Sequence, residues 1–167
     1  VTESASFLSS DVILAYARTL AITRQQGDLD VSAEAHVFRL LGEHVQETMF
    51  HAEPRELAEA LLAIATFCCS RQSGLPDAAL EAPWHHGVFA AAASPFTSQA
   101  PNLPAEVLVK ALRAFSLHIR ALRQQRLEGQ QLIEAPGASI DPEELLTVLV
   151  EALSPRLAEL ESHRVVR

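Results

Sequence analysis

The residues best suited to binding an anion are the cations between positions 110 and 126. We call residues 110–126 the basic segment. It holds five basic side chains and no acidic one, in a chain whose formal net charge is −8. The segment therefore carries +5 and the remainder of the chain −13. Such cations attract phosphate groups or an acidic protein surface, and arginine suits bidentate contacts with either. The candidate RNA- or partner-binding residues are Lys110, Arg113, Arg120, Arg123 and Arg126.

The spacing of these cations leaves three interpretations open. Lys110, Arg113, Arg120 and Arg123 lie at i, i+3, i+10 and i+13, which we expect to place them on one side of a helix. Cations without a neighbouring acid repel one another unless an anion faces them. The segment is therefore a solvated face balanced by acids of neighbouring helices, an RNA-binding surface, or a docking site for an acidic protein.

Histidine is the other residue type whose placement could bind a metal. His85 and His86 are adjacent in the sequence PWHHG, and we expect adjacent side chains to point to different sides of a helix. With the single Trp84 beside them, packing against a neighbour is the favoured role. A second group lacks the HExxH spacing of zinc proteases; its members are His36, His44 and His51. We therefore expect no metal site and no cofactor.

Patterns of catalytic residues are absent from the sequence. It contains no nucleophile elbow, no Gly-rich phosphate loop and no arrangement resembling a triad. Acidic residues gather at 53–59 and 141–144, where predicted helices begin, and the helix dipole accounts for them there. Cys68 and Cys69 are adjacent and suit a buried apolar environment. We expect no enzyme and no small-molecule substrate.

The elements that must position these residues are predicted to be helices. Apolar residues recur with helical spacing in 57–68 and 108–122, and no useful period-2 run appears. Loops rich in Gly, Pro and Ser occupy 70–76, 95–104 and 135–142. No apolar stretch is long enough to span a membrane. We predict helices near 9–25, 31–50, 54–70, 76–93, 104–127, a short one at 128–134, and 142–162, the last interrupted at Pro155.

One helical phrase recurs four times along the chain. Its copies begin at Asp11, Glu56, Glu106 and Glu144, at steps of 45, 50 and 38 residues, with Ser or Pro two residues before each acid. A period in this range is typical of an α-solenoid, in which helical hairpins stack on their neighbours. We predict a single all-α repeat domain over 1–167, an α-solenoid of about four irregular hairpins, with units near 7–50, 51–96, 97–140 and 141–167.

The clearest copy of the phrase is PRELAEALLAIA, from Pro54 to Ala65. It resembles the helical repeats of organellar RNA-binding proteins, namely the octotricopeptide and heptatricopeptide repeat proteins and the FAST-kinase-like and RAP-domain proteins. The resemblance extends over roughly residues 7–154, with irregular spacing, an unusually acidic balance and no RAP-like domain after the repeats. It implies an organellar protein, for which we expect the mitochondrial matrix, and contact with RNA or a ribonucleoprotein.

The resemblance and the charge distribution together predict a non-enzymatic subunit of a mitochondrial ribosome. It would dock on rRNA or ribosomal proteins through its helical-repeat surface. The alternative is an accessory scaffold subunit of a respiratory or ATP synthase complex that binds protein only, which the sequence pI of about 5.3 favours. A third possibility is a free-standing repeat module that holds a peptide in its groove. Because neither end of the array is clearly polar-capped, we expect these residues to pack against the rest of their own polypeptide or against a protein partner.

Overall fold

A computed structural model describes residues 31–69, 84–127 and 141–162, which form helices joined by short turns and contain no strand. The all-α prediction is confirmed for this part of the chain. None of its helices has the length and hydropathy needed to cross a membrane. The elements are α2 (Val31–Thr48), α3 (Pro54–Cys69), α4 (Trp84–Gln99), η3 (Ala100–Asn102), α5 (Ala105–Leu127), α6 (Pro142–Leu153), η4 (Ser154–Arg156) and α7 (Leu157–Ser162).

Two features of the predicted boundaries involve proline. The predicted loop at 95–104 is wrong in its first half, because α4 continues through Pro95 to Gln99. Burial of Phe96 and Ala100 keeps the apolar spacing of α4 intact beyond the proline. The interruption predicted at Pro155 is confirmed, since a 3-10 turn separates α6 from α7 there. The helices predicted at 9–25 and 128–134 lie outside the described residues.

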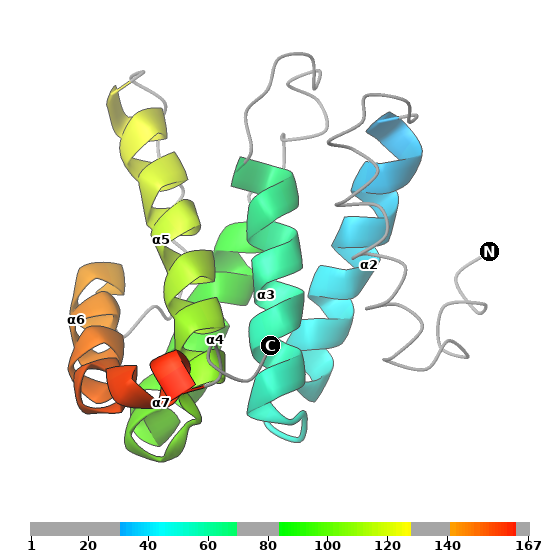
Figure 1. Ribbon diagram of the computed structural model, residues 1–167. Coiled ribbons are helices and arrows are strands. Elements are labelled where there is room, and N and C mark those ends of the chain that lie inside the picture. The colour runs from blue at the N-terminus through cyan, green and yellow to red at the C-terminus, as the bar shows by residue number, and fades with distance from the viewer. Residues whose placement is uncertain (1–30, 70–83, 128–140, 163–167) are drawn as a thin grey trace.

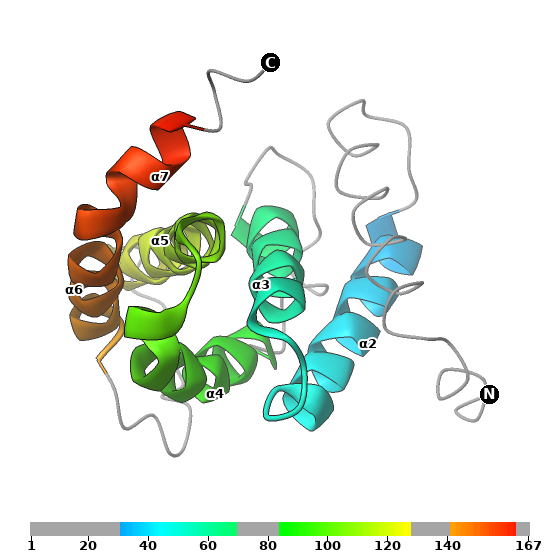
Figure 2. The ribbon, with the colours of Figure 1, turned by 60° about the horizontal axis from the view of Figure 1, so that its bottom comes forward.

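The helices form two layers. Helices α3 and α5 lie side by side, with α2 beyond α3 and α6 beyond α5 (Figure 1). Helix α4 lies beneath this row and contacts both α2 and α6 (Figure 2). Several contacts therefore join helices that are next but one along the chain: α3 with α5, α2 with α4, and α4 with α6.

The buried side chains of these helices form one continuous apolar core. Phe38 of α2 stacks on Phe67 of α3, with ring centroids 4.0 Å apart. Leu145 and Leu149 bring α6 into the same core and are fully buried. Each such side chain contributes about 1.5–3 kcal/mol by leaving water.

Helix α6 begins at an N-cap, Asp141. Asp141 Oδ1 accepts a hydrogen bond from the backbone N–H of Glu143 at 3.1 Å, and Pro142 occupies the first helical position. We expect Asp141→Ala to lower the free energy of unfolding by about 1 kcal/mol. That loss lowers the thermal midpoint by about 2–4 °C. Asp141→Asn keeps an acceptor, so calorimetry showing an equal loss in both variants would contradict the capping role.

Candidate functional site

The five predicted cations lie on different sides of α5. Lys110 Nζ donates to Glu59 Oε1 of α3 at 2.7 Å and to Glu106 Oε1 at 2.9 Å. Arg123 Nη2 donates to Glu143 Oε1 of α6 at 2.5 Å. Positions 110 and 123 are about 140° apart around an α-helix, so these two cations face opposite neighbours. The single-sided arrangement expected from the spacing is therefore wrong for this pair.

The remaining three cations point to solvent. Arg113, Arg120 and Arg126 are exposed, and none forms an ion pair with a residue in the described part of the chain. Arg113 and Arg120 are seven residues apart and so share a side of the helix. Val109 and Leu127 are exposed on that side too, Leu127 at 88%. We call Val109, Arg113, Arg120 and Leu127 the outer face of α5.

One acid on the same side of α5 as this outer face, Glu106, is already engaged. Glu106 accepts hydrogen bonds from Lys110 and from Arg55 Nη2, the latter at 3.1 Å. The hydrogen bond and the charge of Lys110, followed by the charge of Arg55, hold the pKa of Glu106 below its usual value. Glu106 is therefore ionised at neutral pH and its charge is shared by two cations. It does not neutralise Arg113 or Arg120.

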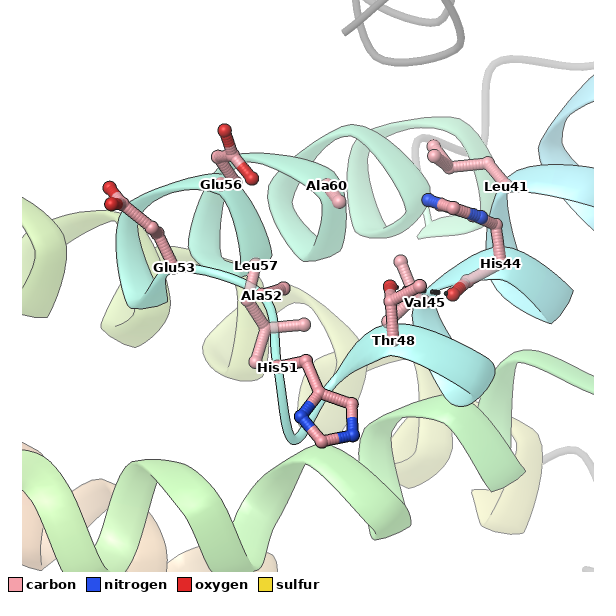
Figure 3. Close-up of a pocket in the computed structure, with 10 residues that line it drawn as sticks. All are labelled: Leu41, His44, Val45, Thr48, His51, Ala52, Glu53, Glu56, Leu57 and Ala60. Carbon is pink, nitrogen blue, oxygen red and sulfur yellow. Dashed lines mark hydrogen bonds between the residues drawn. The ribbon is translucent and has the colours of Figure 1, made fainter. Parts of the chain in front are cut away.

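A groove with a volume of about 280 Å³ lies between α2 and the start of α3 (Figure 3). The carboxylates of Glu53 and Glu56 point away from α2. A catalytic site requires polar groups that converge on one point, and the polar groups of this groove do not. Of the histidines considered above, His44 and His51 line it. The lining residues are Leu41, His44, Val45, Thr48, His51, Ala52, Glu53, Glu56, Leu57 and Ala60.

Three histidines converge between α4 and α5 and form what we call the histidine cluster: His85, His86 and His118. The ring centroids are 4.1 Å apart for His85–His86, 5.1 Å for His86–His118 and 5.7 Å for His85–His118. One potential ligand atom from each residue lies within 4.8 Å of the other two. The residues are 4%, 8% and 4% exposed, respectively.

The expectation that His85 and His86 diverge is therefore wrong. Both lie in the first turn of α4, where their rings reach the same neighbour on α5, His118. His118 is not among the residues that the sequence pattern predicts as ligands or site residues. A signal for it existed, because His118 follows Phe115 by three residues and precedes Ile119 in the apolar series of α5. A histidine on the buried side of a helix needs hydrogen-bond or metal partners for its ring nitrogens.

The electrostatics of the cluster favour neutral imidazoles. Burial, with a smaller contribution from His86, lowers the pKa of His85 to about 3. Burial, followed by the charges of His86 and His85, lowers the pKa of His118 to about 2. The His118 ring stacks on Phe89 with centroids 4.2 Å apart, and its Nδ1 is buried without a hydrogen bond to any described residue. Neutral imidazole is also the form that binds transition metals.

The structure thus offers two candidate sites that involve α5: an exposed set of arginines on that helix, and a buried set of ring nitrogens between α4 and α5. The resemblance to organellar helical-repeat proteins stays a prediction. Comparison of the chain with known protein families, with curated proteins and with solved structures finds no match.

Proposed function

We propose that the chain is a helical-repeat subunit of a mitochondrial ribosome that binds rRNA through the outer face of α5 and through Arg126 in the last turn of the same helix. One observation carries the proposal. Arg113, Arg120 and Arg126 are exposed and have no acidic partner among the described residues, although the chain has a net charge of −8. Acids on neighbouring helices neutralise Lys110 and Arg123 but not these three.

The chemistry of the outer face suits a nucleic-acid strand. A guanidinium presents a planar fork of donors that matches a phosphate group. Exposed apolar side chains at either end of the face, Val109 and Leu127, can contact sugars or bases between the phosphates. Three phosphate contacts on a single strand predict that log K falls with log salt at a slope of about −2.

The packing of the helices supports the repeat arrangement within this proposal. The two clearest copies of the repeated phrase begin α3 and α5, and these helices pack side by side. Arg55 in the first turn of α3 is bonded to Glu106 in the first turn of α5, so the two copies are aligned at their starts. Helix α2 likewise contacts α4, the next but one, as in a stack of hairpins.

The test is the triple variant Arg113→Glu, Arg120→Glu and Arg126→Glu. We expect affinity for a single-stranded rRNA fragment to fall at least about 100-fold, because three attractive contacts become repulsive. The salt dependence of any residual binding should become much weaker. In gently lysed organelles, the variant should no longer sediment with an RNase-sensitive particle. Normal incorporation of the triple variant would refute the proposed RNA-binding face.

Glu143→Gln is a matched control that should change RNA affinity in the opposite direction. It removes the acid that binds Arg123 and leaves an exposed, neutral side chain in its place. If the arginines of α5 bind phosphates, the released Arg123 should strengthen RNA binding and steepen the salt slope by about 0.7. A variant that merely disturbed the fold would weaken binding instead. Circular dichroism of both variants should match that of the native chain.

The second candidate function is the protein-only scaffold of a respiratory or ATP synthase complex. Exposed apolar side chains favour it: Leu127 on α5, Val150 on α6 and Leu157 on α7, which are 88%, 47% and 53% exposed. A buried protein interface would remove this surface from water. In that case the large particle survives RNase, and the triple variant still enters it.

A further inference from the structure

We propose that His85, His86 and His118 form a zinc site that joins the start of α4 to the middle of α5. The ligand atoms already lie within 4.8 Å of one another. Zinc–nitrogen bonds of about 2.0–2.1 Å in a tetrahedral arrangement require nitrogens about 3.4 Å apart. The three nitrogens therefore need to approach one another by at most about 1.4 Å, a displacement on the scale of a side-chain rotation.

The donor set fits zinc by its chemistry. Three neutral imidazoles are the ligand set of open zinc sites, in which water takes the fourth position. The described residues near the cluster add no sulfur or carboxylate ligand to this group. The His118 Nδ1 is buried and forms no hydrogen bond with described residues, and a buried polar atom in that state carries a desolvation cost. A metal bond at Nδ1 removes that cost.

The competing explanation is that the rings are ordinary core side chains. The stacking of His118 on Phe89 is compatible with it. It does not explain the buried His118 Nδ1, which forms no hydrogen bond with a described residue and needs a partner. Zinc binding and core packing also differ in a measurable way. Only the first makes the stability of the chain depend on the metal.

The first experiment uses the whole chain after treatment with a chelator. Zn²⁺ alone is added, and the stoichiometry is measured by equilibrium dialysis. We expect one equivalent to bind and the thermal midpoint to rise by about 5–10 °C at a free zinc concentration of 100 times Kd. Co²⁺ in place of Zn²⁺ should give the visible absorption of a four-coordinate, nitrogen-ligated ion. A native chain that binds no stoichiometric zinc overturns the proposal.

Two substitutions then assign the ligands. His118→Phe retains a ring that can stack on Phe89, and His85→Gln retains a polar side chain of similar size. Each should weaken zinc binding at least about 100-fold, because even the loss of an outer partner of a metal ligand costs 10–100-fold. Unchanged affinity in both variants overturns the site. If His118→Phe does not fold, the zinc affinity of His85→Gln and the Co²⁺ spectrum of the native chain decide whether the histidines bind the metal.

Two control variants exclude other ligands of this chain. His51→Ala removes an exposed histidine that lies outside the cluster. The double variant Cys68→Ser, Cys69→Ser removes the two thiols of the chain. Both should bind zinc as the native chain does and show the same rise in thermal midpoint. Loss of binding in the cysteine variant would assign the metal to the thiols and overturn the histidine site. The RNA affinity of the outer face of α5 is a separate readout that this proposal leaves unchanged.

Discussion

Replacing Phe115 with alanine is expected to lower the free energy of unfolding by about 3–5 kcal/mol, the usual range for a fully buried aromatic side chain. Phe115 is 2% exposed on the inner side of α5. Its ring meets Phe89 edge-on with centroids 5.3 Å apart, and Phe96 in the same manner at 5.9 Å. The substitution therefore removes apolar burial and two edge-to-face contacts between α5 and α4, and leaves a cavity.

Chemical denaturation with urea measures this loss, provided that the slope with denaturant stays constant between variants. Phe50→Ala is the matched control, because the same side chain is removed from a position that is 77% exposed. It should change stability by no more than about 0.5 kcal/mol. Similar losses at both positions would mean that Phe115 does not lie in a packed core.

Replacing Ala111 with aspartate is expected to lower the free energy of unfolding by about 3–5 kcal/mol. Ala111 is fully buried in α5, and the neighbouring helix α3 carries the fully buried alanines Ala58 and Ala65. Small side chains of this kind allow two helices to approach closely. Ala111→Asp puts a charge at a position that water does not reach, since the short side chain cannot extend to solvent.

The matched control is Ala91→Asp on the exposed side of α4. Both variants lower helix propensity equally, by less than about 1 kcal/mol, so their difference isolates the effect of burial. Burial raises the pKa of the new carboxyl in the folded chain above its unfolded value. The penalty is therefore complete above the raised folded pKa and shrinks as pH falls toward about 4. A pH-independent difference between the variants would contradict a buried charge.

Helix α5 connects these stability predictions to both proposed sites. Its inner side carries Phe115 in the core and His118 in the histidine cluster. Its outer face carries Arg113 and Arg120. Substitutions on the two sides should therefore have independent effects. Those on the inner side change stability or zinc binding, and those on the outer face change RNA binding. Sites more than about 7–10 Å apart without shared partners usually have additive effects.

Local sequence patterns predict the helices of the described residues and many of their ends. The period of the apolar residues predicts α3 and α5, and Pro54 and Asp141–Pro142 mark helix starts that the structure retains. These features are local, since propensity, capping and proline geometry act within a few residues. Pro95 shows where local rules fail. Burial of Phe96 outweighed the proline, and α4 continued past it.

Only the tertiary structure decided which side chains meet. Lys110 and Arg123 look equivalent to the other cations in sequence, yet each pairs with an acid on a different neighbouring helix. His118 is 32 residues from His86 in the chain and meets it because α4 lies beneath α5. Periodicity defines which side of a helix is apolar, whereas partners from distant segments depend on how helices cross and at what register. That geometry is set by packing the whole core.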